Sequence, residues 1–188
     1  MTENAEEQGT NKKIMLMGLD NSGKTSISLC LRGVRNLSSF TELNPTKDVD
    51  FRNFKLLGTD FNIWDLAGQV PYRKNHINKL PNNLEGLDKL IYIIDIQDKK
   101  RYEEALDYLK QIIEIIAKTE DTNNTEINVF LHKFDPDLEN QDVNINSEDI
   151  KKLVSKIKKI IPSEIPLKIQ RSSIYTVFQK WNLDEDLG

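Results

Sequence analysis

The stretch GLDNSGKT, residues 18–25, lies between a short apolar run, KKIMLMG, and an apolar pattern with helical spacing. It matches the pattern G-x-x-x-x-G-K-[ST], in which a glycine-rich loop joins a buried strand to a helix. Gly18 and Gly23 let the backbone wrap around phosphates, and the N–H groups of the loop and of the helix start attract an anion. We expect Lys24 to reach the terminal phosphates and Thr25 to offer a hydroxyl to Mg²⁺. The stretch therefore predicts a phosphate-binding loop within an α/β fold.

Strand and helix patterns alternate along the rest of the chain. Apolar, β-branched runs typical of buried strands occupy residues 90–96 and 127–132, and 167–173 is a further predicted strand. Long amphipathic helices are predicted from 101 to 118 and from 147 to 161, a hairpin from 51 to 65, and a short last helix from 174 to 181. Ser147 is the expected start signal of the second long helix. We predict a mostly parallel six-stranded sheet with one antiparallel edge strand and helices on both faces.

The composition excludes several classes of protein. The 188 residues suffice for one domain with a sizeable core, and the net charge of −4 argues against a nucleic-acid partner. Cys30 is the one cysteine, so an intramolecular disulfide is excluded, and we expect it in the core. Neither a membrane-spanning run, a secretory signal nor a lipidation motif is seen. We expect a cytoplasmic protein without an intrinsic membrane anchor, which would reach a membrane through a partner or an amphipathic surface.

A second motif, WDLAGQ at residues 64–69, follows an apolar strand pattern. Asp65 ends the strand, where a carboxylate can hold Mg²⁺ through water, and Gly68 could bring its backbone N–H to a γ-phosphate. Gln69 could orient an attacking water, as in phosphoryl-transfer enzymes. A strand end with a polar turn is the alternative, but the phosphate-binding loop upstream favours the functional interpretation. Arg73 could act as an arginine in cis, although a solvated residue is the expectation.

A third motif, HKFD at residues 132–135, follows another buried strand. Together GLDNSGKT, WDLAGQ and HKFD resemble the Ras superfamily of small GTPases, over about residues 12–181. Within it the chain is most similar to the Rag (Gtr) family, while GLDNSGKT and WDLAGQ are also similar to Arf-type GTPases. The resemblance implies the fold of a P-loop NTPase G domain.

The resemblance assigns further roles. NPT, residues 44–46, is the switch I candidate, with Thr46 closing on Mg²⁺ and the γ-phosphate, and residues 66–80 form the switch II candidate. Asp135 would accept hydrogen bonds from guanine, and Lys133 would lay its stem over the base. His132 replaces the usual asparagine, as Rag-type proteins do, and would donate a hydrogen bond to a base nitrogen or to the loop backbone. A core histidine that merely ends the strand is the alternative.

The expected site residues fall into three overlapping groups. Gln69 and Lys24 are the catalytic candidates, and the candidate metal ligands are Thr25, Thr46 and Asp65. The candidate nucleotide-binding residues are Asp20, Asn21, Ser22, Gly23, Lys24, Thr25, Ser26, Thr46, Gly68, His132, Lys133, Asp135, Ser173 and Ile174. The backbone N–H of Ile174 would meet the guanine carbonyl, with Ser173 in support.

These roles predict a GTP/GDP switch that binds Mg²⁺ and hydrolyses GTP slowly. A GTP-holding scaffold without hydrolysis and an Arf-type trafficking GTPase are the alternatives. Expected partners are an exchange factor, an activating protein and effectors, with roadblock or longin-type proteins or a second GTPase as further candidates. We expect an acidic flexible tail at residues 1–11, a G domain at 12–182 and a tail at 183–188, without the roadblock domain of Rag proteins.

Overall fold

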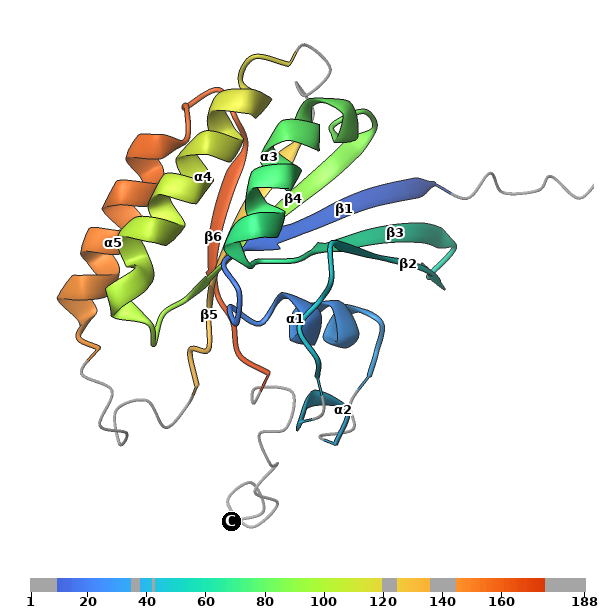
Figure 1. The fold of residues 1–188 in the computed structure, drawn as a ribbon, viewed down its shortest axis with the longest axis horizontal. Coiled ribbons are helices and arrows are strands. Elements are labelled where there is room, and N and C mark those ends of the chain that lie inside the picture. The colour runs from blue at the N-terminus through green and yellow to red at the C-terminus, as the bar shows by residue number, and fades with distance from the viewer. Residues whose placement is uncertain (1–9, 35–37, 42, 120–124, 136–144, 175–188) are drawn as a thin grey trace, which may run out of the picture.

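Six strands form one sheet in the order β2-β3-β1-β4-β5-β6 (Figure 1). The computed structural model describes residues 10–34, 38–41, 43–119, 125–135 and 145–174. The strands are β1 (Asn11–Gly18), β2 (Val49–Leu56), β3 (Thr59–Leu66), β4 (Leu87–Asp95), β5 (Glu126–His132) and β6 (Leu167–Arg171). All neighbouring pairs are parallel except β2–β3, the hairpin at one edge. The predicted sheet, with its single antiparallel edge strand, is confirmed.

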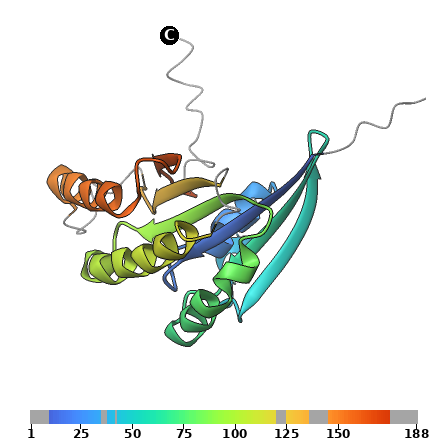
Figure 2. The ribbon, with the colours of Figure 1, turned by 90° about the horizontal axis from the view of Figure 1, so that it is seen from above.

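Helices cover both faces of the sheet, as predicted. They are α1 (Lys24–Leu31), α2 (Ser38–Thr41), α3 (Val70–Asn83), η1 (Lys99–Arg101), α4 (Tyr102–Ile116) and α5 (Ser147–Ile160). Figure 2 shows α3 and α4 on one side of the sheet and α1 on the other. None of the helices in the described part of the chain has the length and apolar character needed to cross a membrane.

The two faces of the sheet belong to two hydrophobic clusters. In β1, Met15 and Met17 join the cluster of α3, α4 and α5, while Ile14 and Leu16 join Ile27 of α1. Because successive residues of a strand point to opposite faces, a strand covered on both faces must be apolar throughout. This accounts for the continuous apolar runs of β1, β4 and β5, and it leaves polar residues mainly at the strand ends.

Some local predictions on the helices need correction. Cys30 is only half-buried, and Leu31 of the same predicted apolar face is 37% exposed. Helix α3 was not predicted, because its sequence VPYRKNHINKLPNN is mostly polar and contains two prolines. The expected helix at 174–181 lies outside the described residues except for Ile174.

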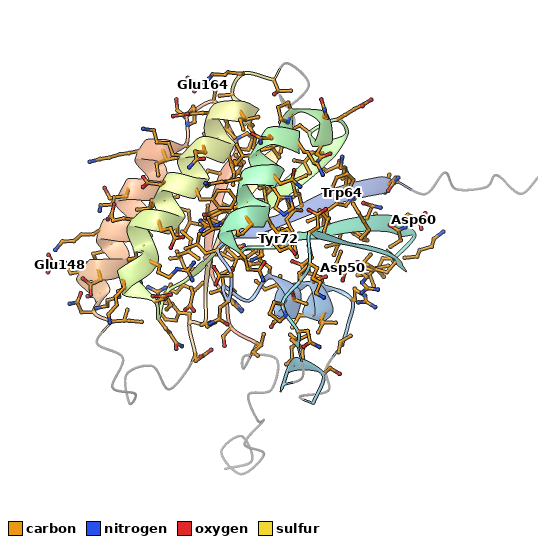
Figure 3. All side chains as sticks on the ribbon, viewed as in Figure 1. Asp50, Asp60, Trp64, Tyr72, Glu148 and Glu164 are labelled. Atoms are coloured by element: carbon orange, nitrogen blue, oxygen red, sulfur yellow. The ribbon has the colours of Figure 1, made fainter. Side chains whose placement is uncertain are left out.

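Figure 3 shows Asp60 at the tip of the β2–β3 hairpin and Glu148 at the start of α5, at opposite ends of the molecule.

The predicted start signal of α5 is wrong by one residue. Asn146, not Ser147, is the N-cap, and its side chain accepts a hydrogen bond from the backbone N–H of Asp149 at 2.8 Å. The Asp149 carboxylate in turn accepts from the backbone N–H of Asn146. This reciprocal pair is a capping box, which satisfies two N–H groups at the helix start. The apolar stripe of α5 packs inward through Ile150, Leu153 and Ile157.

Replacing Asn146 by alanine should lower the free energy of unfolding by about 1 kcal/mol, because the backbone N–H of Asp149 loses its acceptor, the Asn146 side chain. Urea denaturation followed by circular dichroism measures the change. Ser147→Ala is the matched control, with an expected change below about 0.5 kcal/mol at an exposed position. Equal losses in the two variants would contradict the assigned cap.

Candidate nucleotide-binding site

The loop between β1 and α1 wraps tightly because its glycines cannot carry a side chain. Gly18 has φ 147°, and a Cβ atom there would lie 2.3 Å from the carbonyl oxygen of Ile93. Gly23 has φ 92°, and a Cβ atom there would lie 2.4 Å from the His132 ring. The loop borders a cavity of about 460 Å³ lined by Asp20, Asn21, Gly23, Lys24, Thr25, Ser26, Leu43, Asn44, Pro45, Thr46, Gly68 and Gln69.

Lys24 is a buried cation at the floor of this cavity. Its Nζ donates to the carbonyl oxygen of Leu19 at 2.6 Å and to that of Gly18 at 3.2 Å. Burial lowers the pKa of Lys24 to about 8, and the nearby charges of Asp65 and Asp20 only partly oppose this effect. A bound anion would offset the desolvation, so the residue fits a phosphate-binding role.

Three oxygen-bearing side chains converge beside Lys24. Thr25 Oγ1 donates to Asp65 Oδ2 at 2.7 Å, and Thr46 Oγ1 lies 3.0 Å from Thr25 Oγ1 and 3.3 Å from Asp65 Oδ2. Asp65 is 1% exposed, burial raises its pKa, and its Oδ1 has no hydrogen-bond partner among the described residues. The described residues contain no His, Cys, Asp and Glu group of three or more suited to a metal ion. The hydroxyl and carboxylate oxygens fit Mg²⁺, which prefers such ligands and keeps several waters.

The segment after β3 lies directly against the phosphate-binding loop. The carbonyl oxygen of Gly68 accepts from the backbone N–H of Asp20 at 3.1 Å, and a Cβ atom on Gly68 would lie 2.2 Å from that nitrogen. A glycine is therefore required for contact between the two segments, whatever its N–H does with a phosphate. Gln69 is the N-cap of α3 and lines the cavity, and its Oε1 is buried without a partner among the described residues.

The ends of β4, β5 and β6 hold the third motif at the same edge of the sheet. Asp135 accepts from Gln97 Nε2 at 2.9 Å and also from the hydroxyl of Ser173. Lys133, with φ 59°, forms an ion pair with Asp95 at 2.6 Å. Side chains at the ends of β4 and β6 thus fix the orientation of the motif, which follows β5 between them. Ile174 comes directly after Ser173.

The ring of His132 lies between two loops and contacts both of them. Its Nδ1 lies 3.0 Å from Ser172 Oγ, and its Cδ2–Nε2 edge faces Gly23. The partner of Nδ1 is thus a side-chain hydroxyl, and the hydrogen bond from the ring to a base nitrogen or to the loop backbone stays a prediction. Burial lowers the pKa of His132 to about 4, so the ring is neutral at physiological pH.

The comparisons with known proteins identify the family. The family model described as the Gtr1/RagA G protein conserved region matches residues 13–182. The chain belongs to the Gtr1/RagA G protein family. The predicted resemblance to Rag-type small GTPases is confirmed.

This G protein is also similar in sequence to curated Arf-like proteins. The chain is 33% identical to ADP-ribosylation factor-like protein alp41 of Schizosaccharomyces pombe over 101 residues, which are 54% of the chain and 50% of that protein. It is 36% identical to ADP-ribosylation factor-like protein 3 of Caenorhabditis elegans over 102 residues, 51% of the chain and 48% of that protein. The chain thus spans about half the length of the curated relatives it matches.

A solved structure shares the fold of this G protein. It is the small GTPase Arl6 (BBS3) of Trypanosoma brucei with the bound nucleotide analogue GppNp. The TM-score is 0.61 at 20% identity, and the alignment covers 94% of this chain and 92% of the other. At this identity the likeness concerns the fold alone.

The predicted site residues of the G protein form two groups, which His132 joins through its contact with Gly23. Those that line the large cavity are Asp20, Asn21, Gly23, Lys24, Thr25, Ser26, Thr46, Gly68 and Gln69. Asp65 is bonded to Thr25, and Lys133, Asp135 and Ser173 lie at the strand ends. Ser22 is buried, at 2% exposed, and its side chain lies outside the large cavity, beside the smaller pocket bordered by Asp20 and Arg101. Arg73 was predicted to be solvated, and this is wrong, because it is 8% exposed. Its guanidinium donates to Glu104 and lies 5.3 Å from the ring centre of Tyr108. The helical spacing of α3 turns Arg73 toward α4 and away from the cavity.

Several residues that shape the G protein site were missed by the sequence analysis. Asp95 and Gln97 orient the third motif. Both lie at the end of β4, and ligand-binding groups gather at the ends of buried parallel strands. The position of these two residues was therefore a usable signal. His76 of α3 is buried, with Nδ1 3.9 Å from Asp48 Oδ1, and Ala67 donates its backbone N–H to the Asp48 carbonyl. No sequence motif marks that contact between the switch II candidate and Asp48, which lies two residues after the switch I candidate.

The burial of His132 predicts a pH-dependent stability. Because its pKa falls from 6.5 unfolded to about 4 folded, the unfolded chain binds the proton more readily between these values. This contribution to stability is present above pH 6.5 and is lost as the pH falls. Lowering the pH from 7 to 5 should cost about 2 kcal/mol of unfolding free energy through His132. Urea titrations at both pH values measure the loss.

His132→Asn keeps a polar side chain and removes the titration, so its loss between pH 7 and pH 5 should be smaller than that of the unaltered protein. The chain has two histidines, and burial also lowers the pKa of His76, so His76→Asn gives the contribution of the other ring. An unchanged pH profile in His132→Asn would contradict the prediction.

Proposed function

We propose that the protein is a guanine-nucleotide switch, which binds GTP and GDP with Mg²⁺ and hydrolyses GTP slowly. One observation carries the proposal. A single cavity is lined by the buried cation Lys24, by the hydroxyl-bearing Thr25 and Thr46, which are bonded to Asp65 behind them, and by Gln69, whose amide oxygen has no partner among the described residues. A nucleoside triphosphate with its metal needs these three kinds of group in this proximity. Membership in the Gtr1/RagA G protein family supports the same function.

The chain's own residues would act mainly by position and charge. Lys24 and the loop N–H groups bind the phosphates, and Thr25, Thr46 and Asp65 would hold Mg²⁺, which neutralises charge on the phosphate oxygens when bound. Gln69 would orient the attacking water through its amide oxygen. Its side chain makes no cap hydrogen bond to α3, and its Oε1 is buried without a partner among the described residues, so no hydrogen bond to this oxygen would have to break when the amide turns toward the cavity. Phosphoryl transfer requires little else from the protein.

The third motif would select the base. Asp135 offers carboxylate oxygens to the guanine N1–H and exocyclic amine, which adenine does not present in that arrangement. The N1 atom of adenine is an acceptor and would face the Asp135 carboxylate without a hydrogen bond, so an adenine in this place would be disfavoured. Gln97 and Ser173 hold the Asp135 carboxylate in one orientation, which supports selectivity.

The first test is nucleotide binding and single-turnover hydrolysis of GTP and ATP by the purified protein with Mg²⁺. We expect tight binding of GTP, weak binding of ATP and slow conversion of GTP to GDP. GTP binding without any conversion over hours would favour a scaffold whose nucleotide is structural. Preference for ATP would overturn the role of Asp135.

Gln69→Leu should lower single-turnover hydrolysis of GTP by roughly tenfold or more, because the attacking water loses its orienting group. GTP affinity should stay the same, since Gln69 contributes no cap to α3. Gln111→Leu, on the exposed side of α4, is the control and should change neither quantity. Unchanged hydrolysis in Gln69→Leu would remove the residue from the catalytic assignment.

An activating protein is part of the proposal. Arg73 is engaged by Glu104 and Tyr108, so the nearest arginine after Gln69 in the chain is not free to reach the phosphates. A positive charge supplied by a partner would then speed a slow intrinsic reaction. We also propose an exchange factor and effectors, met in the cytoplasm or on a membrane to which a partner recruits the protein. The similarity to ADP-ribosylation factor-like proteins over about half of the chain supports an Arf-type GTPase as the alternative to a Rag-type one.

A further inference from the structure

An acidic side chain borders the cavity proposed to hold three phosphates. Asp20, the third residue of the phosphate-binding loop, lines that cavity, and its backbone N–H is bound to Gly68, next to Gln69. It therefore lies at the end of the cavity where hydrolysis would occur. A bare carboxylate there would repel a terminal phosphate, whose charge has the same sign.

Arg101 binds this carboxylate from outside the loop. It ends η1, just before α4, and its Nη2 donates to Asp20 Oδ1 at 2.6 Å. Burial raises the pKa of Asp20, but the hydrogen bond and charge of Arg101 outweigh it, so the pKa lies below its ordinary value. Both groups are therefore charged at neutral pH, and Arg101 cancels the charge of Asp20.

Glu104 holds Arg101 in this place and is itself held by Arg73. Its Nε donates to Glu104 Oε2 at 2.8 Å, one turn into α4. The other oxygen of Glu104 accepts from Arg73 of α3, in the switch II candidate. Two arginines and two carboxylates thus alternate in a chain from the phosphate-binding loop to α3. Because Arg101 is held on two sides, it can keep Asp20 in one orientation.

We propose that Arg101 is a positioning residue that sets the preference of the site for GTP over GDP. By binding Asp20 it holds the carboxylate toward α4 and neutralises it, so that the cavity accepts a third phosphate. Removal of the charge of Arg101 would leave Asp20 free to oppose the triphosphate, while the diphosphate, which lacks the group at that end, would be less affected. The inference rests on the proposed function.

The test compares affinities for GTP and GDP, with Mg²⁺, in the unaltered protein and in Arg101→Gln, which keeps a stem and a hydrogen-bond donor. The ratio of Kd for GTP to Kd for GDP should rise about tenfold, or about 1.4 kcal/mol. Lys100→Gln removes a positive charge from the same turn at an exposed position and should leave the ratio unchanged. Arg101→Lys keeps the charge without the planar fork and should give a smaller shift than Arg101→Gln.

The same comparison in an Asp20→Asn background tests whether Arg101 acts through Asp20. If Arg101 acts through Asp20, adding Arg101→Gln to Asp20→Asn should leave the ratio close to that of Asp20→Asn alone. An equal shift in both backgrounds would mean that Arg101 acts on the nucleotide directly and would overturn the inference. So would an equal loss of affinity for both nucleotides in Arg101→Gln, as a merely structural role predicts.

Failure of the inference and failure of the proposed function are distinguishable. An unaltered protein that binds neither GTP nor GDP overturns the proposed function. An unaltered protein that binds both, with the same ratio in Arg101→Gln, overturns only the role of Arg101. If Arg101→Gln does not fold, Arg101→Met, which also removes the charge and keeps an unbranched stem, carries the same comparison in the two backgrounds, and an unchanged ratio there overturns the inference.

Discussion

The parallel register between β1 and β3 is the constraint on which the site depends. It sets Leu16 opposite Asp65, so that the phosphate-binding loop and the WDLAGQ segment leave the sheet side by side. The backbone N–H of Asp20 then reaches the carbonyl of Gly68, and Thr25 reaches Asp65. A shift of one residue would turn the side chains of β3 to the opposite faces and remove Asp65 from the cluster.

The site contains buried charges whose surroundings only partly compensate them. Burial lowers the pKa of Lys24 and raises that of Asp65, and one oxygen of Asp65 has no partner among the described residues. Both costs would fall when a phosphate and a divalent cation bind, because each charge would then gain an opposite charge. Part of the free energy of nucleotide binding would thereby become stability of the folded protein.

The base-binding end differs from the phosphate-binding end, because its polar side chains already have hydrogen-bond or ion-pair partners within the protein. Asp135, Lys133 and His132 each have a protein partner that comes from the end of another strand. A side chain held in this way needs little reorganisation when a ligand arrives. His132 accordingly replaces an amide with a ring that contacts Gly23 and Ser172, and so joins the base-binding end to the phosphate-binding loop.

The sequence by itself determined the alternation of strands and helices, the antiparallel edge hairpin and the three motifs, because apolar periodicity and glycine-rich loops are local signals. The cap at Asn146 is also a local signal, an Asn with an Asp three residues later, but the sequence analysis placed it one residue too late. Mostly polar α3 and the burial of Arg73 were outside the reach of the sequence. These features depend on which neighbour a helix meets, and a polar helix with two prolines carries only a weak periodic signal. The ion pairs from Asp20 through Arg101 and Glu104 to Arg73 join residues up to 81 positions apart. Only the tertiary structure decided them, because charged side chains find their partners through the packing of α3 and α4 on the sheet.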